Sequence, residues 1–207
     1  MTHEISVEKR KYNEGLAEGF TFFIFSIFLT HYASLYAKIR ASNFVDDIIL
    51  SNTRVYNFET IFVEGAIFMA LFVVVLSFKY YKGAPYILKT ISLFIAIRAL
   101  FVMLTHIAPF PVQLDVASNL LGFITTGNDL FFSGHTGLPF LVALMFWKHS
   151  YLRRLFLVSS FVFGVVVLLS HLHYSIDVFA AFFITHSIYT ISKKLFREDY
   201  ERFEKCI

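Results

Sequence analysis

Residues 152–195 read LRRLFLVSSFVFGVVVLLSHLHYSIDVFAAFFITHSIYTISKKL. Two long apolar runs, 152–171 and 175–195, meet at a short polar segment that carries histidines and is followed by an aspartate. A membrane-spanning helix needs about 20 mostly apolar residues, and a helix satisfies its backbone hydrogen bonds internally, as lipid requires. The pattern therefore predicts two membrane helices joined by a polar turn.

The composition of the whole chain agrees with this interpretation. Of its 207 residues, 57% are hydrophobic and only 16% are charged, whereas soluble domains usually carry about 25% charged residues. The mean hydropathy is +0.65. The single cysteine, Cys206, excludes an internal disulfide framework. The length suits one domain, so we predict an all-α, polytopic protein in which residues 1–207 form a single membrane domain.

Six segments have the length and composition of membrane helices, which predicts six transmembrane helices. They are residues 16–37, 58–78, 86–108, 131–148, 152–171 and 175–195. Pro109, Pro111 and Gly122 interrupt the sequence between the third and fourth spans, and we interpret 109–130 as a loop with a short interfacial helix around 114–124. The polar N-terminus precedes a long apolar run, which favours a first span over a cleavable signal.

Basic residues divide unequally between the two sides of this topology. One side holds only Lys38, Arg40 and Arg54. The other side holds fourteen: Lys9, Arg10, Lys11, Lys79, Lys82, Lys89, Lys148, Arg153, Arg154, Lys193, Lys194, Arg197, Arg202 and Lys205. Cytoplasmic connections of membrane proteins carry an excess of Lys and Arg, so both termini are predicted to be cytoplasmic. We interpret the basic residues as a signal for the orientation of the protein in the membrane and not for nucleic-acid binding, so no nucleic-acid partner is expected.

Two polar clusters interrupt the apolar sequence, residues 133–136 (SGHT) and residues 171–177 (HLHYSID). Ionisable side chains inside membrane segments are costly and mark functional sites. In the predicted topology, the fourth span enters the membrane from the exoplasmic side. The turn between the fifth and sixth spans lies on that side too. We therefore expect both clusters at the exoplasmic face, at a similar depth.

The residues of the two clusters suit covalent phosphoryl transfer. His173 and Asp177 are spaced i, i+4 and would share a face if the last helix began near residue 173. A carboxylate that accepts an imidazole N–H fixes the tautomer and makes the other nitrogen a nucleophile. His135 would act as acid and then as base. Ser133 and Gly134, at a helix N-terminus, would bind phosphate.

Three further residues each admit two interpretations. Arg98, within the third span, either recognises phosphate or pairs with an intramembrane acid such as Glu64. Asp129 either caps the fourth helix or contacts the lipid headgroup. His171 makes either a polar contact that supports the site or a contact with the phosphate. A zinc site built from histidine and aspartate is disfavoured because no third or fourth ligand has tight spacing, and no cofactor is predicted.

Around these residues the sequence resembles the sphingomyelin synthases. Residues 127–136, GNDLFFSGHT, are similar to their Gly-Asp-x-x-Phe-Ser-Gly-His-Thr motif, and residues 171–178, HLHYSIDV, are similar to their His-Tyr-Thr-Ile-Asp-Val motif. The resemblance covers about residues 85–195. It points to the sphingomyelin synthase-like family, within the lipid phosphate phosphatase (PAP2) superfamily, with a C-terminal-type domain. Val167 stands where the wider superfamily's third motif has arginine, which favours the synthase branch over the phosphatases.

The resemblance implies a six-helix protein with an exoplasmic, metal-free site. It implies that His173 is the nucleophile and forms a phosphohistidine-type intermediate, with Asp177 as its partner and His135 as the acid/base. The implied reaction transfers a phosphocholine or phosphoethanolamine group from a phospholipid donor to a lipid alcohol, either ceramide or diacylglycerol. The expected location is a bacterial inner membrane or a eukaryotic Golgi, plasma or endoplasmic reticulum membrane.

Two other functions remain open at the level of sequence. A lipid phosphatase or a phospholipase C-type hydrolase would use the same three residues, with water as the acceptor. A lipid-binding or transport protein would retain these residues as an inactive site.

Overall fold

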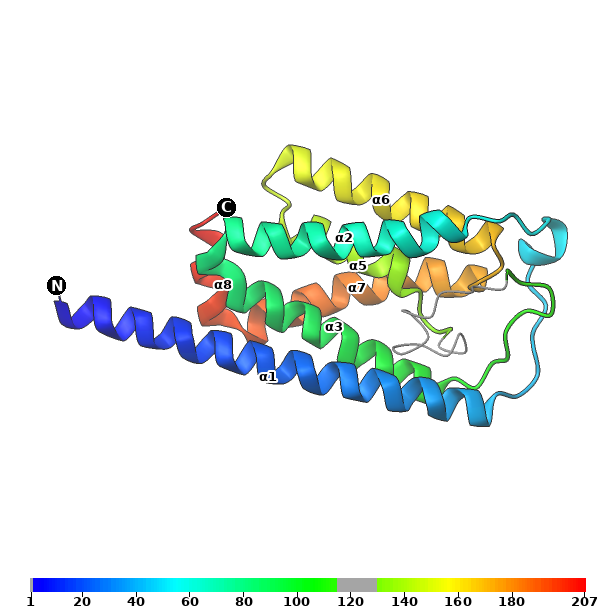
Figure 1. Cartoon of the computed structure of the whole chain (residues 1–207), viewed down its shortest axis with the longest axis horizontal. Coiled ribbons are helices and arrows are strands. Elements are labelled where there is room, and N and C mark those ends of the chain that lie inside the picture. The colour runs from blue at the N-terminus through cyan, green and yellow to red at the C-terminus, as the bar shows by residue number, and fades with distance from the viewer. Residues whose placement is uncertain (1, 115–129) are drawn as a thin grey trace.

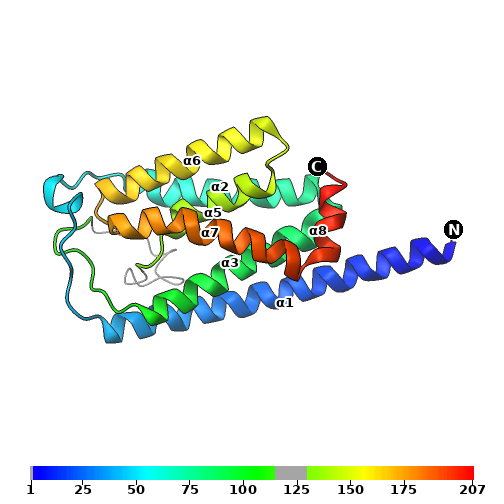
Figure 2. The same ribbon diagram turned by 180° about the vertical axis from the view of Figure 1, so that it is seen from behind.

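The computed structural model describes residues 2–114 and 130–207, with side chains from residue 7 onward. Every regular element in these residues is helical, which confirms the all-α prediction. The α-helices are α1 (Thr2–Arg40), α2 (Glu59–Lys79), α3 (Ala84–Leu104), α5 (Gly134–Met145), α6 (Ser150–Leu169), α7 (Ser175–Leu195) and α8 (Arg197–Glu204). Short 3₁₀ turns lie at Leu50–Asn52 and Tyr81–Gly83. The helices α1 to α7 run alternately up and down one bundle (Figures 1 and 2).

Five helical segments of the described residues are long and apolar enough to cross a membrane. They are Val7–Arg40, Glu59–Lys79, Tyr81–Leu104, Ser150–Leu169 and Ser175–Leu195. The last one has the bounds that the sequence predicts. α1 starts well before the predicted span, and its N-terminal part projects beyond the bundle (Figure 1). α3 ends at Leu104, before the predicted 108, because Thr105 adopts an extended conformation. These helices identify an integral membrane protein.

The predicted fourth span, 131–148, differs from the helix that forms there. α5 contains 12 residues, which at about 1.5 Å per residue is shorter than a hydrocarbon core of about 30 Å. The helix starts late because Ser133 has an extended backbone and its side chain accepts the N–H of Thr136. It ends where Phe146 leaves the helical conformation. Within residues 2–114 and 130–207, the structure therefore has five candidate spans, and a shorter apolar helix lies at the position of the predicted fourth span.

α5 lies in the interior of the bundle, packed against α6 and α7. Its residues Leu141, Val142 and Ala143 are fully buried. A methyl group added at Gly137 would lie 2.8 Å from Thr185 Oγ1 on α7 and 2.9 Å from the ring of Phe94 on α3. The absent side chain thus allows both neighbouring helices to approach α5 closely. This contact fixes the depth of α5 in the bundle, and with it the position of the first polar cluster.

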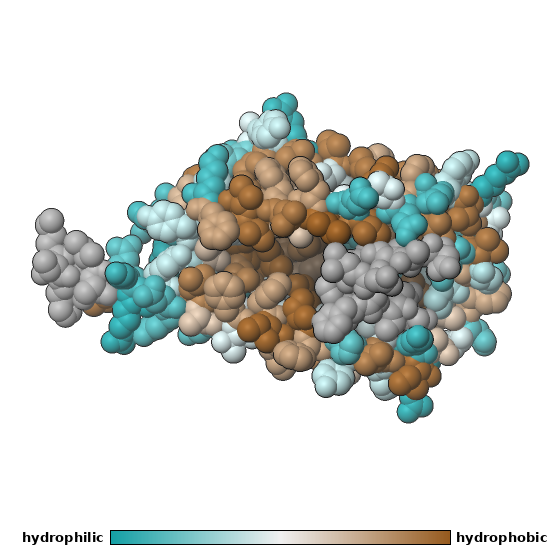
Figure 3. Space-filling view, viewed as in Figure 1, coloured by the Kyte–Doolittle hydropathy of each residue, from teal (hydrophilic) through white to brown (hydrophobic). Residues whose placement is uncertain are grey.

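The outer surface of the bundle is apolar along its middle. Brown, hydrophobic residues dominate the centre of the face seen in Figure 3, and hydrophilic residues gather mainly around its two ends. Large side chains that point outward include Phe25 and Phe28 on α1 and Phe68 on α2, which are 59%, 60% and 68% exposed. A continuous exposed apolar surface of this kind suits contact with lipid chains.

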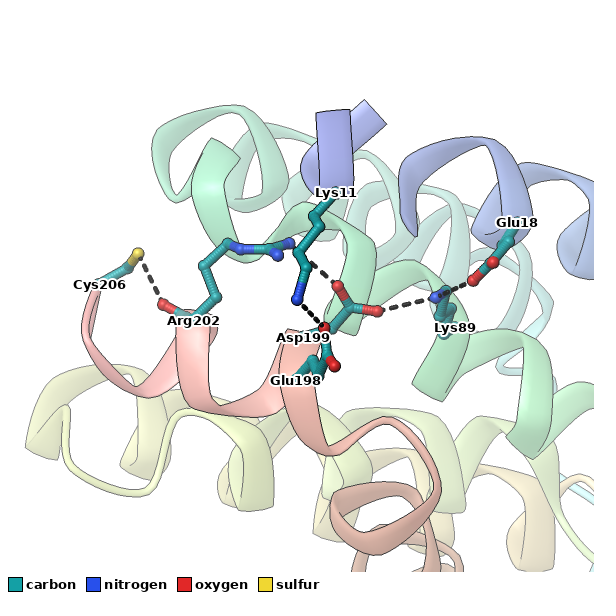
Figure 4. A network of polar contacts seen from close by, with 7 residues as sticks. All are labelled: Lys11, Glu18, Lys89, Glu198, Asp199, Arg202 and Cys206. Atoms are coloured by element: carbon teal, nitrogen blue, oxygen red, sulfur yellow. Dashed lines mark hydrogen bonds and ion pairs between the residues drawn. The ribbon is translucent and has the colours of Figure 1, made fainter. Parts of the chain in front are cut away.

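A network of ion pairs joins α1, α3 and α8 at the end of the bundle that holds both termini (Figure 4). The buried Lys89 ammonium lies 2.6 Å from Glu18 Oε2 and 2.8 Å from Asp199 Oδ2. Asp199 also forms an ion pair with Arg202, whose Nη1 lies 3.1 Å from Asp199 Oδ1. A cavity of about 590 Å³ opens beside this network. Because Lys89 and Asp199 are both buried, loss of either would leave the other charge uncompensated.

Candidate active site

The first turn of α5 and the first turn of α7 are joined by a direct hydrogen bond. The backbone N–H of Ser133 donates to the carbonyl oxygen of Asp177 at 3.1 Å. Ser133 belongs to the first polar cluster and Asp177 to the second, and both are buried. The two clusters therefore meet at one end of the bundle, opposite the end that holds the chain termini (Figure 1).

His173 and Asp177 form a buried pair. His173 Nδ1 lies 3.3 Å from Asp177 Oδ2, and the two side chains are 7% and 1% exposed. α7 begins at Ser175, so His173 precedes the helix and the two residues do not share the helical face that we expected. The carboxylate instead turns back over the first turn of α7. There it accepts the N–H of Tyr174 at 3.0 Å and also reaches the imidazole.

This geometry defines the chemistry of the His173 ring. A carboxylate at Nδ1 favours the tautomer that carries its proton on Nδ1, which assigns the lone pair to Nε2. Within residues 2–114 and 130–207, no hydrogen-bond partner of Nε2 is found. Asp177 Oδ1 is enclosed and lacks a partner in the same residues. His173 can thus present Nε2 to a ligand while Asp177 holds the opposite edge of the ring.

Asp47, in the loop between α1 and α2, binds the first residue of α7. Its Oδ2 accepts the N–H of Ser175 at 2.7 Å, and its Oδ1 accepts the N–H groups of Ile49 and Leu50. Burial raises the pKa of the Asp47 carboxyl, but the hydrogen bonds from Ser175, Leu50 and Ile49 outweigh this effect and hold the pKa below its usual value. The sequence analysis missed this residue, because an acid in a polar loop carries no local pattern that links it to α7.

We expect Asp47→Asn to lower the free energy of unfolding by about 1 kcal/mol at pH 7, since a charged acceptor at the start of α7 is lost. A carboxyl whose pKa is lower in the folded state stabilises the fold above its unfolded pKa, near 3.8. This stabilisation disappears as the pH falls through the folded pKa. The difference between wild type and Asp47→Asn should therefore begin to shrink as the pH falls below 3.8 and should keep shrinking as the pH falls further.

Thermal unfolding of the detergent-solubilised protein between pH 7 and pH 3 measures this effect. The neighbouring, exposed Asp46 offers a matched control, and Asp46→Asn should unfold like wild type throughout. An Asp47→Asn deficit that stayed constant down to pH 3 would show that the charge of Asp47 does not stabilise the start of α7.

His135 is the second residue of α5 and lies between aromatic side chains of two other helices. Its ring stacks on Phe62 of α2, with ring centroids 4.0 Å apart and planes 24° apart. The ring of Phe163 on α6 is a second neighbour. Its centroid lies 5.8 Å from that of the His135 ring, and the two ring planes are 58° apart. His135 lies two residues after Ser133, whose backbone is bonded to Asp177. The fold thus brings the predicted acid/base to the end of the bundle where the predicted nucleophile lies.

Arg98 reaches the start of α5 from α3. Its Nε donates to the carbonyl oxygen of Phe132 at 2.8 Å, and a methyl group added at Gly134 would lie 3.1 Å from that Nε. Arg98 therefore lies directly against the proposed phosphate-binding turn. Among the described residues, Arg98 makes no ion pair with Glu64, the alternative partner that the sequence left open.

His171 links the loops around the site. Its Nδ1 lies 2.8 Å from the carbonyl oxygen of Val112, to which it donates, and its Nε2 lies 3.2 Å from Thr53 Oγ1. The backbone at His171 has a positive φ of 55°, which is uncommon for a residue with a side chain. The ring is 3% exposed. These contacts fit polar support of the turn before His173.

One predicted site residue lies outside the described residues: Asp129, together with the loop helix predicted around 114–124. In the part of the chain that the structure describes, no group of three or more His, Cys, Asp or Glu side chains is arranged to hold a metal ion.

One of three comparisons with known proteins gave a match. The comparisons with curated proteins and with solved structures gave no match. Residues 126–194 match a family model described as PAP2 superfamily C-terminal. This segment contains both polar clusters and is similar to the sphingomyelin synthase-like type of that superfamily. PAP2 superfamily proteins are generally lipid phosphatases and phosphotransferases, so the match suggests a membrane enzyme that acts on phosphorus in lipids.

Proposed function

We propose that this protein transfers a phospho-headgroup, of the phosphocholine or phosphoethanolamine type, from a phospholipid to a lipid alcohol such as ceramide or diacylglycerol. The observation that carries the proposal is the buried His173–Asp177 pair, joined through the Ser133–Asp177 hydrogen bond to the turn that bears His135. The pair supplies an oriented nucleophile, and the second histidine supplies an acid/base. All three side chains lie within residues 126–194, the segment that matches the PAP2 superfamily C-terminal model.

In the first step, His173 Nε2 attacks the phosphorus of the donor lipid. A P–N bond forms, the P–O bond to the glycerol oxygen breaks, and His135 gives a proton to that oxygen, so that diacylglycerol leaves as an alcohol. In the second step, His135 takes the proton of the acceptor hydroxyl. The acceptor oxygen attacks phosphorus, the P–N bond breaks, and both histidines return to their starting states. Asp177 stabilises the charge that develops on the His173 ring.

The start of α5 is the proposed phosphate-binding turn. A helix N-terminus offers unpaired N–H groups and a positive dipole, and Gly134 has no side chain to keep phosphate oxygens away from that backbone. The Arg98 guanidinium, which lies against Gly134, would neutralise the phosphate charge. We propose supporting roles for His171 in fixing the turn before His173 and for Asp129 in contact with the donor headgroup.

The proposed orientation puts both termini in the cytoplasm and the site at the exoplasmic face. Its support is the distribution of basic residues, which leaves three on the side of the loops that surround His173. The shorter helix α5 would then be a sixth, protein-enclosed membrane segment that enters from the exoplasmic side.

The single native cysteine provides a direct test of the orientation. In sealed, right-side-out vesicles we expect Cys206 to react with a membrane-impermeant maleimide only after the membrane is permeabilised. Ser51→Cys, in a Cys206→Ser background, should react before permeabilisation, because Ser51 is exposed in the loop between α1 and α2. The reverse pattern would contradict the proposed orientation.

Mass spectrometry of lipid products tests the reaction itself. The purified protein is incubated with labelled phosphatidylcholine or phosphatidylethanolamine, alone and with ceramide or diacylglycerol. A transferase should release diacylglycerol and form an acceptor lipid that carries the labelled headgroup. Free phosphocholine or phosphoethanolamine in place of that lipid would identify a hydrolase. Lipid binding without a change in phosphorus linkage, across all donors, would contradict an enzymatic function.

A further inference from the structure

We infer that Phe62 of α2 is a positioning residue for His135, an inference that rests on the proposed acid/base function of that histidine. The imidazole ring and the Phe62 ring are 4.0 Å apart between centroids and only 24° from parallel. Neither the polar motifs nor the matched segment 126–194 contains Phe62. In sequence it is one of 27 phenylalanines and reads as ordinary packing.

The stack acts on the face of the ring and not on its reactive edge. Both the N–H bond and the nitrogen lone pair of imidazole lie in the plane of the ring. A side chain that covers the face of the ring therefore restricts rotation about Cβ–Cγ without blocking either nitrogen. Proton transfer depends steeply on alignment. Phe62 would thus fix the plane in which His135 gives its proton to the leaving oxygen.

The backbone of α2 is held in place to make this contact. Gly65 lies less than one helical turn beyond Phe62, and a methyl group added there would lie 3.2 Å from Phe163 Cζ of α6. The missing side chain allows α2 to approach α6 closely at this level. Phe163 is also the second ring beside His135. The same contact between α2 and α6 therefore determines where Phe62 lies.

A leaving-group comparison separates a positioning role from a purely structural one. A phospholipid loses an alkoxide that needs a proton, whereas p-nitrophenyl phosphocholine loses a nitrophenolate that does not. Phe62→Leu should therefore lower turnover of phosphatidylcholine by about tenfold, the worth of one good aromatic stack. The fast release of the first equivalent of nitrophenolate from the nitrophenyl donor should stay close to wild type, because this step needs no proton from His135. Phe62→Tyr keeps the ring and should retain most of the activity on both donors.

Phe72→Leu is the matched control. Phe72 lies on the same helix and packs its ring 5.7 Å from Phe156 of α6, but it makes no ring contact with His135. It should leave turnover of both donors near wild type. A second readout needs no turnover: the rate at which diethyl pyrocarbonate modifies His135, followed by peptide mass spectrometry. Phe62→Leu should raise this rate severalfold, and Phe72→Leu should leave it unchanged.

Each outcome distinguishes this inference from the proposed function. If Phe62→Leu behaves like Phe72→Leu in all measurements while the wild type is active, Phe62 does not position His135 and the proposed reaction stands. Equal losses in phosphatidylcholine turnover and in the first release of nitrophenolate would assign Phe62 to the fold alone and overturn the inference. If wild type turns over neither donor, the proposed function fails, and the rate of His135 modification decides on its own whether the stack holds the ring.

Discussion

Replacing His173 with alanine is expected to lower phospholipid turnover by at least about 10⁴-fold, as loss of a covalent nucleophile does in other enzymes. The loss should be as large with p-nitrophenyl phosphocholine as with phosphatidylcholine, because both donors require the P–N bond to form. Asp177 and the rest of the site would remain, so binding of the donor should change little. Turnover of each donor by the purified variant measures the effect.

A histidine on α7 provides the control for this substitution. His186 is exposed on the outer face of that helix. His186→Ala should keep the wild-type rate with both donors and show that purification and the detergent do not limit activity. A His173→Ala variant with substantial turnover of either donor would rule out His173 as the nucleophile.

Replacing His135 with alanine should produce a different pattern. We expect turnover of phosphatidylcholine to fall by about 10³-fold, within the range for removal of a general acid. The first step with p-nitrophenyl phosphocholine should be nearly unaffected, since nitrophenolate leaves without a proton. Return of the enzyme to its starting state should then become slow, because no base activates the acceptor hydroxyl.

Rapid-mixing measurements of nitrophenolate distinguish these two steps. The variant should give a fast release close to one equivalent of nitrophenolate, followed by slow turnover. Equal losses in both steps, or no loss with phosphatidylcholine, would contradict the acid/base assignment of His135.

The sequence predicts most of the helices well because their apolar runs have clear ends. α7 follows the predicted bounds 175–195, since its apolar run begins within the second polar cluster and ends near Lys193 and Lys194. α5 is shorter than its apolar run because Ser133 caps the helix inside that run. Capping depends on backbone conformation at one residue, which hydropathy does not report.

The sequence predicts the residues of the candidate site by type but does not predict their geometry. The sequence named His173, Asp177 and His135, and the fold brings their clusters together. It did not give the form of the His173–Asp177 contact, because that depends on where α7 begins. Asp47 and Phe62 could not be recognised at all. Each contacts the site from an element distant in sequence, and no local spacing relates Asp47 to α7 or Phe62 to α5.

The covalent intermediate provides the most direct test of the account. The His135→Ala variant, mixed with p-nitrophenyl phosphocholine and quenched at the end of the fast release, should carry one phosphocholine group per chain. Peptide mass spectrometry under conditions that preserve P–N bonds should locate the group on His173, and wild type given ceramide should pass it to the lipid. Turnover without a covalent adduct, or an adduct on another residue, would contradict the central claim that His173 is the nucleophile.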